Sequence, residues 1–338
     1  LRLGRILMKS GASAYRIKAS MARLAKAVGL DEHHAQVTFT EIATTAYGNG
    51  NFRTEVAEQR TMGINSHKID LLGNFISELP ERITPQEANA ELERIDSMPH
   101  LYKRWMLALA SAVACAGFAF LNRGGLIECS AVFIAAGLGQ FLRSTLMKRG
   151  VSHMAIWMAC GFLSAGAYIG LINLLTGLQL IGSEHMVGFI SSILFLVPGF
   201  PMVTGMLDIS RMDLLAGMSR LMYVTVLLVS ASFAVWVLAS LFHLPLAQNA
   251  RPDIPAGLYL LLQVVSSGVA AAGFAMLFAA SPVACVWGGV IAAVANPARI
   301  WLVEAGWTSH MAATLAVFAV GIMAELVAPL HGRQYSRI

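Results

Sequence analysis

An apolar stretch near the middle of the chain contains two prolines and two glycines within eight positions: Pro198, Gly199, Pro201 and Gly205. Proline removes a backbone donor and leaves a carbonyl without its helical partner, and glycine lets the chain bend. Inside a bilayer, irregular backbone is tolerated where protein encloses it or where it lines a water-filled cavity. Secondary transporters bind polar substrates at broken helices of this kind, although a plain proline kink would give the same pattern.

Charged residues gather directly after this stretch. A zwitterionic substrate needs one anionic and one cationic contact, and an acid–arginine cluster supplies both. We therefore expect a substrate pathway formed by Pro198, Gly199, Thr204, Asp208, Asp213 and Arg220. An interfacial charge network on the cytoplasmic side of a membrane fits the same residues equally well.

Other polar residues lie in or near the remaining apolar runs. Ionisable groups inside a membrane are functional hypotheses by default. We expect Asn173 and Asn296 to belong to the pathway, and Asp208, Glu128 and Glu325 to be candidates for proton coupling. Either glutamate could instead extend to the membrane interface. The Cys and His spacing suits no metal ion, and we expect no metal, cofactor or catalytic residue.

The composition identifies the elements that hold these residues. The chain is 57% hydrophobic and 13% charged, whereas soluble proteins carry about 25% charged residues. Residues 1–104 hold 14 of the 24 Lys and Arg and 12 of the 19 Asp and Glu. The remainder cannot cover a water-facing surface. The sequence therefore predicts a polytopic α-helical membrane domain preceded by a soluble head.

Eight apolar runs follow the head, each close to the roughly 20 residues that cross a bilayer. They lie at about 105–121, 125–142, 153–175, 186–207, 215–242, 258–279, 283–302 and 311–329. Basic residues follow the second, fourth and eighth runs, whereas the loop 176–185 has no Lys or Arg. The positive-inside rule then places the head in the cytoplasm.

Two short matches predict an internal repeat. Residues 113–121 resemble residues 269–277 at an offset of 156, and Ser152–Ala155 matches Ser309–Ala312 at an offset of 157. A repeat of five spans is odd in number, so its copies would cross the membrane in opposite directions, as in many secondary transporters. Chance similarity among abundant small residues is the alternative.

This repeat sets the expected domain boundaries. We expect a cytoplasmic α+β domain at 1–103, a first repeat of five transmembrane helices at 104–243 and a partial second repeat of three helices at 257–338. Two further helices would then follow the sequence given, or a second membrane subunit would supply them.

The head reads as an α+β unit. Residues 1–30 predict one basic amphipathic helix that lies on an anionic membrane surface or packs on the head. Asn49-Gly50 between two β-rich runs, 37–47 and 52–56, predicts a hairpin. Residues 66–79 predict a helix, and a capping box at Thr84 opens another that reaches about Ser97.

At the level of motifs, the chain resembles the threonine/serine exporter family over nearly its whole length. The resemblance includes the segment Gly11–Arg16 and the Gly124-Gly125 pair that leads into Glu128. Its most specific part is residues 196–199 followed by Asp208, Asp213, Gly217 and Arg220. The family often has Asn at the position of Thr204 and Gly at that of Met212, so this chain departs from the pattern there.

The resemblance implies a multi-pass protein of the bacterial inner membrane with a cytoplasmic head and ten spans. It implies proton-driven export of threonine and serine, whereas related two-subunit systems export dicarboxylates such as succinate. The expected partners are a small-molecule substrate, the lipid bilayer and possible further helices or a second subunit, and no nucleic acid. The alternatives are a dicarboxylate exporter, a membrane-bound hydrolase with the head as enzyme, and a lipid-responsive sensor.

Overall fold

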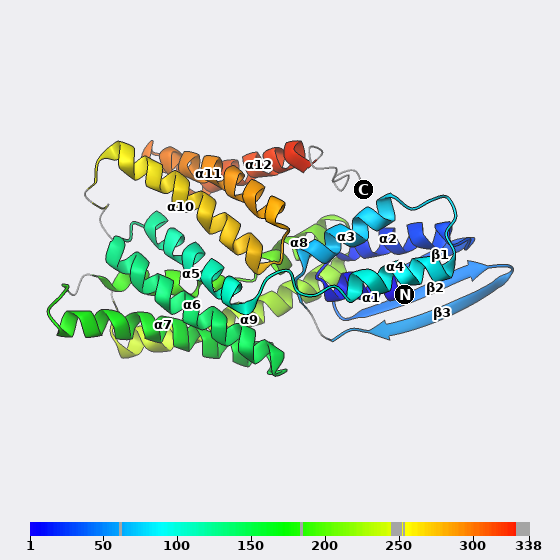
Figure 1. The fold of residues 1–338 in the computed structure, drawn as a ribbon, viewed down its shortest axis with the longest axis horizontal. Helices are drawn as coiled ribbons and strands as arrows, with labels where there is room; N and C mark the ends of the chain where they lie inside the picture. The colour runs from blue at the N-terminus through cyan, green and yellow to red at the C-terminus, as the bar shows by residue number, and fades with distance from the viewer. Residues whose placement is uncertain (61–62, 183–184, 245–251, 253, 329–338) are drawn as a thin grey trace. The chain divides into compact units, whose positions relative to one another are not determined.

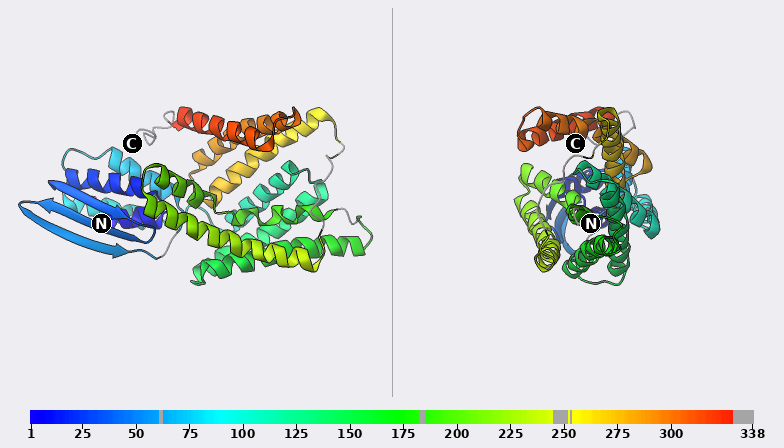
Figure 2. Two further views of the ribbon diagram at one scale, coloured as in Figure 1. Left: turned by 180° about the vertical axis from the view of Figure 1, so that it is seen from behind. Right: turned by 90° about the vertical axis from the view of Figure 1, so that its left-hand side faces the viewer.

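The computed structural model describes residues 1–60, 63–182, 185–244, 252 and 254–328, and Figures 1 and 2 show its elements. The chain forms two compact units. The first contains Leu1–Leu101 together with Gly199–Thr225. The second contains Tyr102–Pro198 and Val226–Val327.

The first unit contains an antiparallel sheet in the order β1-β2-β3 (Figure 1). Its strands are β1 (Glu32–Val37), β2 (Glu41–Gly48) and β3 (Asn51–Glu58). The predicted β2–β3 hairpin is confirmed, and β1 was not predicted as a separate strand. The Asn49-Gly50 turn has φ values of 54° and 73°, the left-handed pair that a tight two-residue hairpin needs.

The predicted single helix over residues 1–30 is wrong. The structure has two helices, α1 (Arg2–Lys9) and α2 (Ala14–Ala27), and Gly11 between them has a φ of +88°. The apolar face of α2 is buried, with Ile17 and Met21 in the head core. Of the two expected roles for this segment, packing on the head is therefore the one observed.

Two further helices complete the head core. They are α3 (Ser66–Ser77) and α4 (Pro85–Asp96), both close to prediction. Thr84 accepts from the backbone of Glu87, whose side chain accepts from the Thr84 backbone, so the expected capping box is present. The same unit includes α8 (Gly199–Ser210) and the start of α9 (Leu214–Leu241).

Seven helices of the described chain are long and apolar enough to cross a membrane. They are α9 and α5 (Arg104–Leu121), α6 (Leu126–Lys148), α7 (His153–Gly177), α10 (Ala256–Leu277), α11 (Pro282–Glu304) and α12 (Ser309–Val327). The chain is therefore a polytopic α-helical membrane protein with a small N-terminal sheet. The expected fourth run is not one continuous helix. It contains the 3-10 helices η1 (His185–Phe189) and η2 (Ser191–Leu196), an extended Val197, and then α8.

Elements of the second unit recur at the offset of 156 that the first sequence match gave. The end of α5 corresponds to the end of α10, both ends of α6 correspond to those of α11, and the start of α7 corresponds to that of α12. The left-handed residues Arg123 and Gly150 correspond in the same way to Ala279 and Gly306. The offset of 157 expected from the Ser152–Ala155 match is therefore one too large for these helices.

The packing between α5 and α10 follows the same offset. A Cβ added at Gly117 would lie 3.0 Å from the Ser266 carbonyl oxygen, and one at Gly273 would lie 2.7 Å from that of Ala110. At this offset Gly273 is the counterpart of Gly117, and Ser266 is the counterpart of Ala110. The two close approaches are therefore equivalent, which makes the contact between the helices reciprocal.

Candidate functional site

Asp208 and Arg220 are brought together by the turn between α8 and α9. Glycines let these helices approach closely, because a Cβ at Gly217 would lie 2.7 Å from the Gly205 carbonyl oxygen. Asp208 Oδ2 lies 3.6 Å from Arg220 Nη2, and both side chains are buried, with 0% and 5% exposed. Removing two charges from water is costly unless further hydrogen bonds satisfy them.

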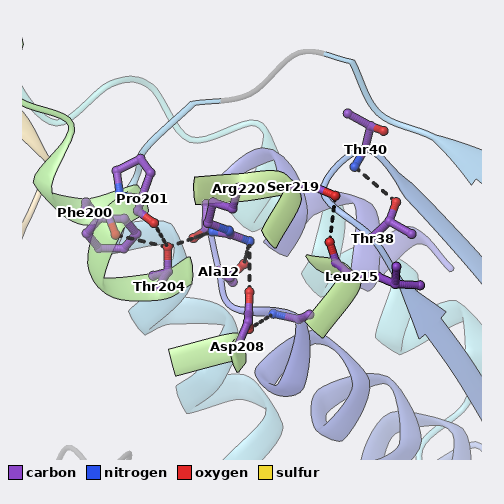
Figure 3. A network of polar contacts seen from close by, with 12 residues as sticks. Ala12, Thr38, Thr40, Phe200, Pro201, Thr204, Asp208, Leu215, Ser219 and Arg220 are labelled. Atoms are coloured by element: carbon purple, nitrogen blue, oxygen red, sulfur yellow. Dashed lines mark hydrogen bonds and ion pairs between the residues drawn. The ribbon is translucent and has the colours of Figure 1, made fainter. Parts of the chain in front are cut away.

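Arg220 obtains its hydrogen bonds from the connection between α1 and α2, as Figure 3 shows in part. Its Nη1 donates to the Gly11 carbonyl at 3.0 Å, and its Nη2 donates to the Ala12 carbonyl at 2.9 Å. Nη1 also donates to Thr204 Oγ1 at 2.8 Å. We refer to residues Ser10–Ser13 as the α1–α2 loop. One guanidinium therefore holds this loop against α8.

Asp208 contacts the beginning of α2. Its Oδ1 accepts the backbone N–H of Ala14 at 2.7 Å, across 194 residues of sequence. The first N–H groups of a helix lack helical partners and carry partial positive charge, so a carboxylate is favourable there. Burial raises the pKa of the Asp208 carboxyl, while Arg220 and the N–H groups of Ala14 and Tyr15 act in the opposite direction.

A second ion pair joins the same elements. Lys18 on α2 pairs with Asp213, the residue before α9. The aromatic rings of Phe39 and Tyr223 lie 5.1 Å apart, and the Arg220 guanidinium lies over Phe39. The head therefore contacts α8 and α9 through charge pairs, backbone hydrogen bonds and ring contacts.

The helix break before α8 is stabilised by two side chains of the second unit. Arg143 donates to the Phe195 carbonyl at 3.0 Å, and the Trp157 indole donates to the Leu196 carbonyl at 2.6 Å. Arg143 also stacks on Trp157, with 4.4 Å to the ring centroid. Pro198 lies just beyond and is buried. The Phe195 and Leu196 carbonyls thus have partners within the protein.

Glu128 and Asn296 also have defined contacts in the second unit. Glu128 is 4% exposed, and its Oε1 lies 2.8 Å from His185 Nδ1. Asn296 donates to Ser267 at 2.8 Å and accepts from Arg299 at 2.9 Å.

The other expected residues are more accessible. Asn173 on α7 and Glu325 on α12 are exposed. The structure thus gathers Thr204, Asp208 and Arg220, whereas Asp213 pairs with Lys18 and Asn173 and Glu325 join no cluster that the described contacts reveal. Across the described residues, no group of three or more His, Cys, Asp or Glu is arranged to hold a metal ion.

Sequence reasoning missed the partners of these residues. His185 was visible only as a histidine at the start of an apolar run, and Lys18 only as one of many basic residues. Gly11 and Ala12 act through carbonyl groups, which no side-chain pattern reveals. Arg143 was interpreted only as a topology signal.

Comparison with known proteins gives a family for the greater part of the chain. Residues 1–242 match the family described as “Putative threonine/serine exporter”. No solved structure matches the chain.

Three relatives are similar to this chain. One, from Escherichia coli (strain K12), is named “Probable succinate transporter subunit YjjP” and is 26% identical over 65% of this chain and 84% of its own length. A protein of the same name from Klebsiella aerogenes is 23% identical over 63% of this chain and 81% of its own length. An uncharacterized Schizosaccharomyces pombe protein is 23% identical over 72% of this chain and 32% of its own length.

Proposed function

Since the chain belongs to the threonine/serine exporter family, we propose that it forms the membrane part of a secondary transporter that exports a small carboxylate-bearing metabolite. The observation that carries this proposal is the buried Asp208–Arg220 pair, formed between the end of α8 and α9, the helices that follow the interrupted fourth run in the sequence. Broken helices with polar groups at the break are how many secondary transporters hold substrate. The family match and the helical membrane domain both favour a transporter over an enzyme.

Threonine and serine are the first proposed substrates. Each carries one positive and one negative group, which are complementary to the Asp208 carboxylate and the Arg220 guanidinium that the head backbone now binds. The Gly11 and Ala12 carbonyls accept from Arg220, and the Ala14 N–H donates to Asp208. An amino acid offers an acceptor carboxylate and a donor ammonium group. Substrate and the α1–α2 loop would therefore compete for one pair of side chains, and the loop would act as a gate.

Export is proposed to be driven by protons entering from outside a bacterial inner membrane, with the head in the cytoplasm. The distribution of basic loops supports this orientation. The offset shared by the helix ends supports an inverted repeat in which α5, α6 and α7 correspond to α10, α11 and α12.

We propose that a second membrane subunit covers α10, α11 and α12, the second copy of the repeat. In the most apolar part of α7, 50% of the residues are buried within the chain, against 6% in its counterpart α12. η2 packs on α7 and accounts for part of this difference. The word “subunit” in the names of two relatives agrees with such a partner.

Dicarboxylate export is the second candidate. Two relatives are named for succinate, and a dicarboxylate needs two cationic contacts. Arg143 and Arg299 provide cations at positions that correspond at the offset of 156. Each is hydrogen-bonded to an amide side chain one helical turn earlier, that of Gln140 or Asn296. This arrangement makes succinate the necessary comparison in any transport assay.

The test is counterflow of labelled threonine and labelled succinate into proteoliposomes, with and without a pH gradient. The proposal expects one of the two to exchange, and Asp208→Ala or Arg220→Ala to abolish that exchange while membrane insertion persists. Arg149→Ala, at an exposed position, is the matched control and should exchange normally. Full exchange by both site variants would remove Asp208 and Arg220 from the pathway.

A further inference from the structure

Glu128 occupies a site that the glycines before it make possible. It lies in the first turn of α6, after Gly124 and the N-cap Gly125. A Cβ at Gly125 would lie 3.1 Å from Glu128 Oε2, and one at Gly124 would lie 3.3 Å from Glu128 Cβ. The two glycines therefore leave room for a carboxylate folded back against the helix start. An acid there also interacts favourably with the helix dipole, which alone would explain its presence.

The partner of Glu128 indicates more than a helix-terminal acid. His185 Nδ1 lies 2.8 Å from Glu128 Oε1, and their side chains are 25% and 5% exposed. Tyr168 on α7 donates to the His185 carbonyl at 2.5 Å and accepts the Gly188 N–H at 3.2 Å, which fixes η1. A carboxylate and an imidazole are thus held in contact inside the membrane unit, and a quarter of the His185 side chain is accessible.

The chemistry of this pair suits the uptake and release of one proton. Imidazole takes up and releases a proton near neutral pH, and Asp, Glu and His side chains form the proton relays of membrane pumps and transporters. Among the described residues, the titratable groups that interact with Glu128 include Cys129 on the same helix and Tyr168 on α7. Both are neutral in their ordinary state, so neither fixes the charge of the pair as an arginine or lysine would.

We propose that Glu128 and His185 form the proton-binding site that couples export to the proton gradient, with His185 as the entry residue and Glu128 as the carrier. This rests on the proposed transport function. In the proposed orientation, the start of α6 and η1 lie toward the outside, where the protons that drive export enter. His185 takes up a proton from outside, the resulting imidazolium passes a proton from Nδ1 to Glu128 Oε1, and release of that proton toward the cytoplasm restores the carboxylate.

Two transport modes distinguish coupling from a structural role. Exchange of labelled for unlabelled substrate needs no net proton movement, whereas efflux against a gradient does. We expect Glu128→Gln to reduce efflux driven by an acidic outside at least tenfold and to leave exchange within about twofold of the unsubstituted protein. Glu128→Asp should retain part of the driven efflux. His310→Gln, which changes an exposed histidine at the start of α12, is the control.

The histidine variant gives a second readout. His185→Phe removes the group that hydrogen-bonds the carboxylate, and the loss of a hydrogen bond to the charged form of a carboxyl group favours its protonated form. We expect the pH for half-maximal driven efflux to rise. Loss of exchange and driven efflux together in folded Glu128→Gln protein, or an unchanged pH profile in both variants, would overturn the proposal.

A spectroscopic test does not depend on the substrate. Infrared difference spectra of the purified protein between acidic and alkaline buffer should show a buried carboxyl band that is absent in Glu128→Gln and displaced in His185→Phe. Asp208 can contribute a band of its own, so the outcome that would overturn the assignment is a Glu128→Gln spectrum that has lost no carboxyl band relative to the unsubstituted protein, even if transport is found. A normal band in a protein that moves neither threonine nor succinate would contradict the proposed function alone.

Discussion

Arg220 and Asp208 lie 3.6 Å apart, yet both direct their hydrogen bonds to backbone of the head that is distant in the sequence. The pair therefore joins the α1–α2 loop to α8 and α9. The N-terminal head is thus part of the same packed unit as α8 and the start of α9.

Arg220→Ala should release the α1–α2 loop. Removing one member of a buried ion pair costs about 3–5 kcal/mol, because the remaining charge stays buried without its partner. Amide hydrogen exchange at residues 10–15 should become faster, and the unfolding temperature should fall. Arg149→Ala, an exposed arginine, should change neither, and unaltered protection of the loop in Arg220→Ala would contradict this role.

The contact at Asp208 should depend on pH. Burial raises the pKa of this carboxyl in the folded protein. Asp208 therefore binds its proton more tightly when the α1–α2 loop is docked on it than in the open state, in which the loop is released. Stability from this group is present below the open-state pKa and is lost as the pH rises through the folded pKa. Protection of residues 10–15 should therefore weaken with rising pH in that window, and Asp208→Asn should flatten the dependence.

Gly217→Ala should force α8 and α9 apart. An added Cβ would lie 2.6 Å from Ile209 Cγ1 and 2.7 Å from the Gly205 carbonyl oxygen, and the second neighbour is backbone. Overpacking of this kind costs about 1–3 kcal/mol. Gly170→Ala, in α7 with no atom within 4 Å of the new Cβ, is the control. Thermal unfolding of both variants compares a crowded glycine with an open one.

Met212→Gly should stabilise the turn between α8 and α9. Met212 has a φ of 63°, and its side chain is 79% exposed. A residue with a Cβ pays about 1–2 kcal/mol in this region of backbone space, and an exposed side chain contributes little packing in return. We expect a rise in unfolding temperature, smaller than that strain because glycine has more freedom when unfolded. A lower unfolding temperature would show that the exposed methionine contributes stability.

Trp157→Phe should destabilise the interrupted segment that precedes α8. It keeps an aromatic ring but removes the donor to the Leu196 carbonyl, and an unsatisfied buried acceptor costs about 1–3 kcal/mol. Trp236→Phe changes a tryptophan that is 65% exposed and should be nearly neutral. The two unfolding temperatures, measured in the same detergent, decide whether the loss of this hydrogen bond matters.

The sequence by itself determined the class of the protein and its local elements. Apolar runs of spanning length predict membrane helices, because the bilayer fixes both their length and their polarity. The Asn49-Gly50 turn and the Thr84 capping box depend on neighbouring residues alone, so they were predictable. Pro198 likewise predicted the interruption before α8, since proline acts on its own turn of helix.

Only the tertiary structure decided what the polar residues contact. Asp208 and Arg220 were expected to face substrate, and they meet backbone atoms of Ala12 and Ala14, which carry no side-chain signal. Glu128 was expected as a candidate for proton coupling with no partner named, and it meets His185 after a separation of 57 residues. Such pairings depend on how distant segments pack, whereas residue types and spacing report mainly on neighbours within a few positions.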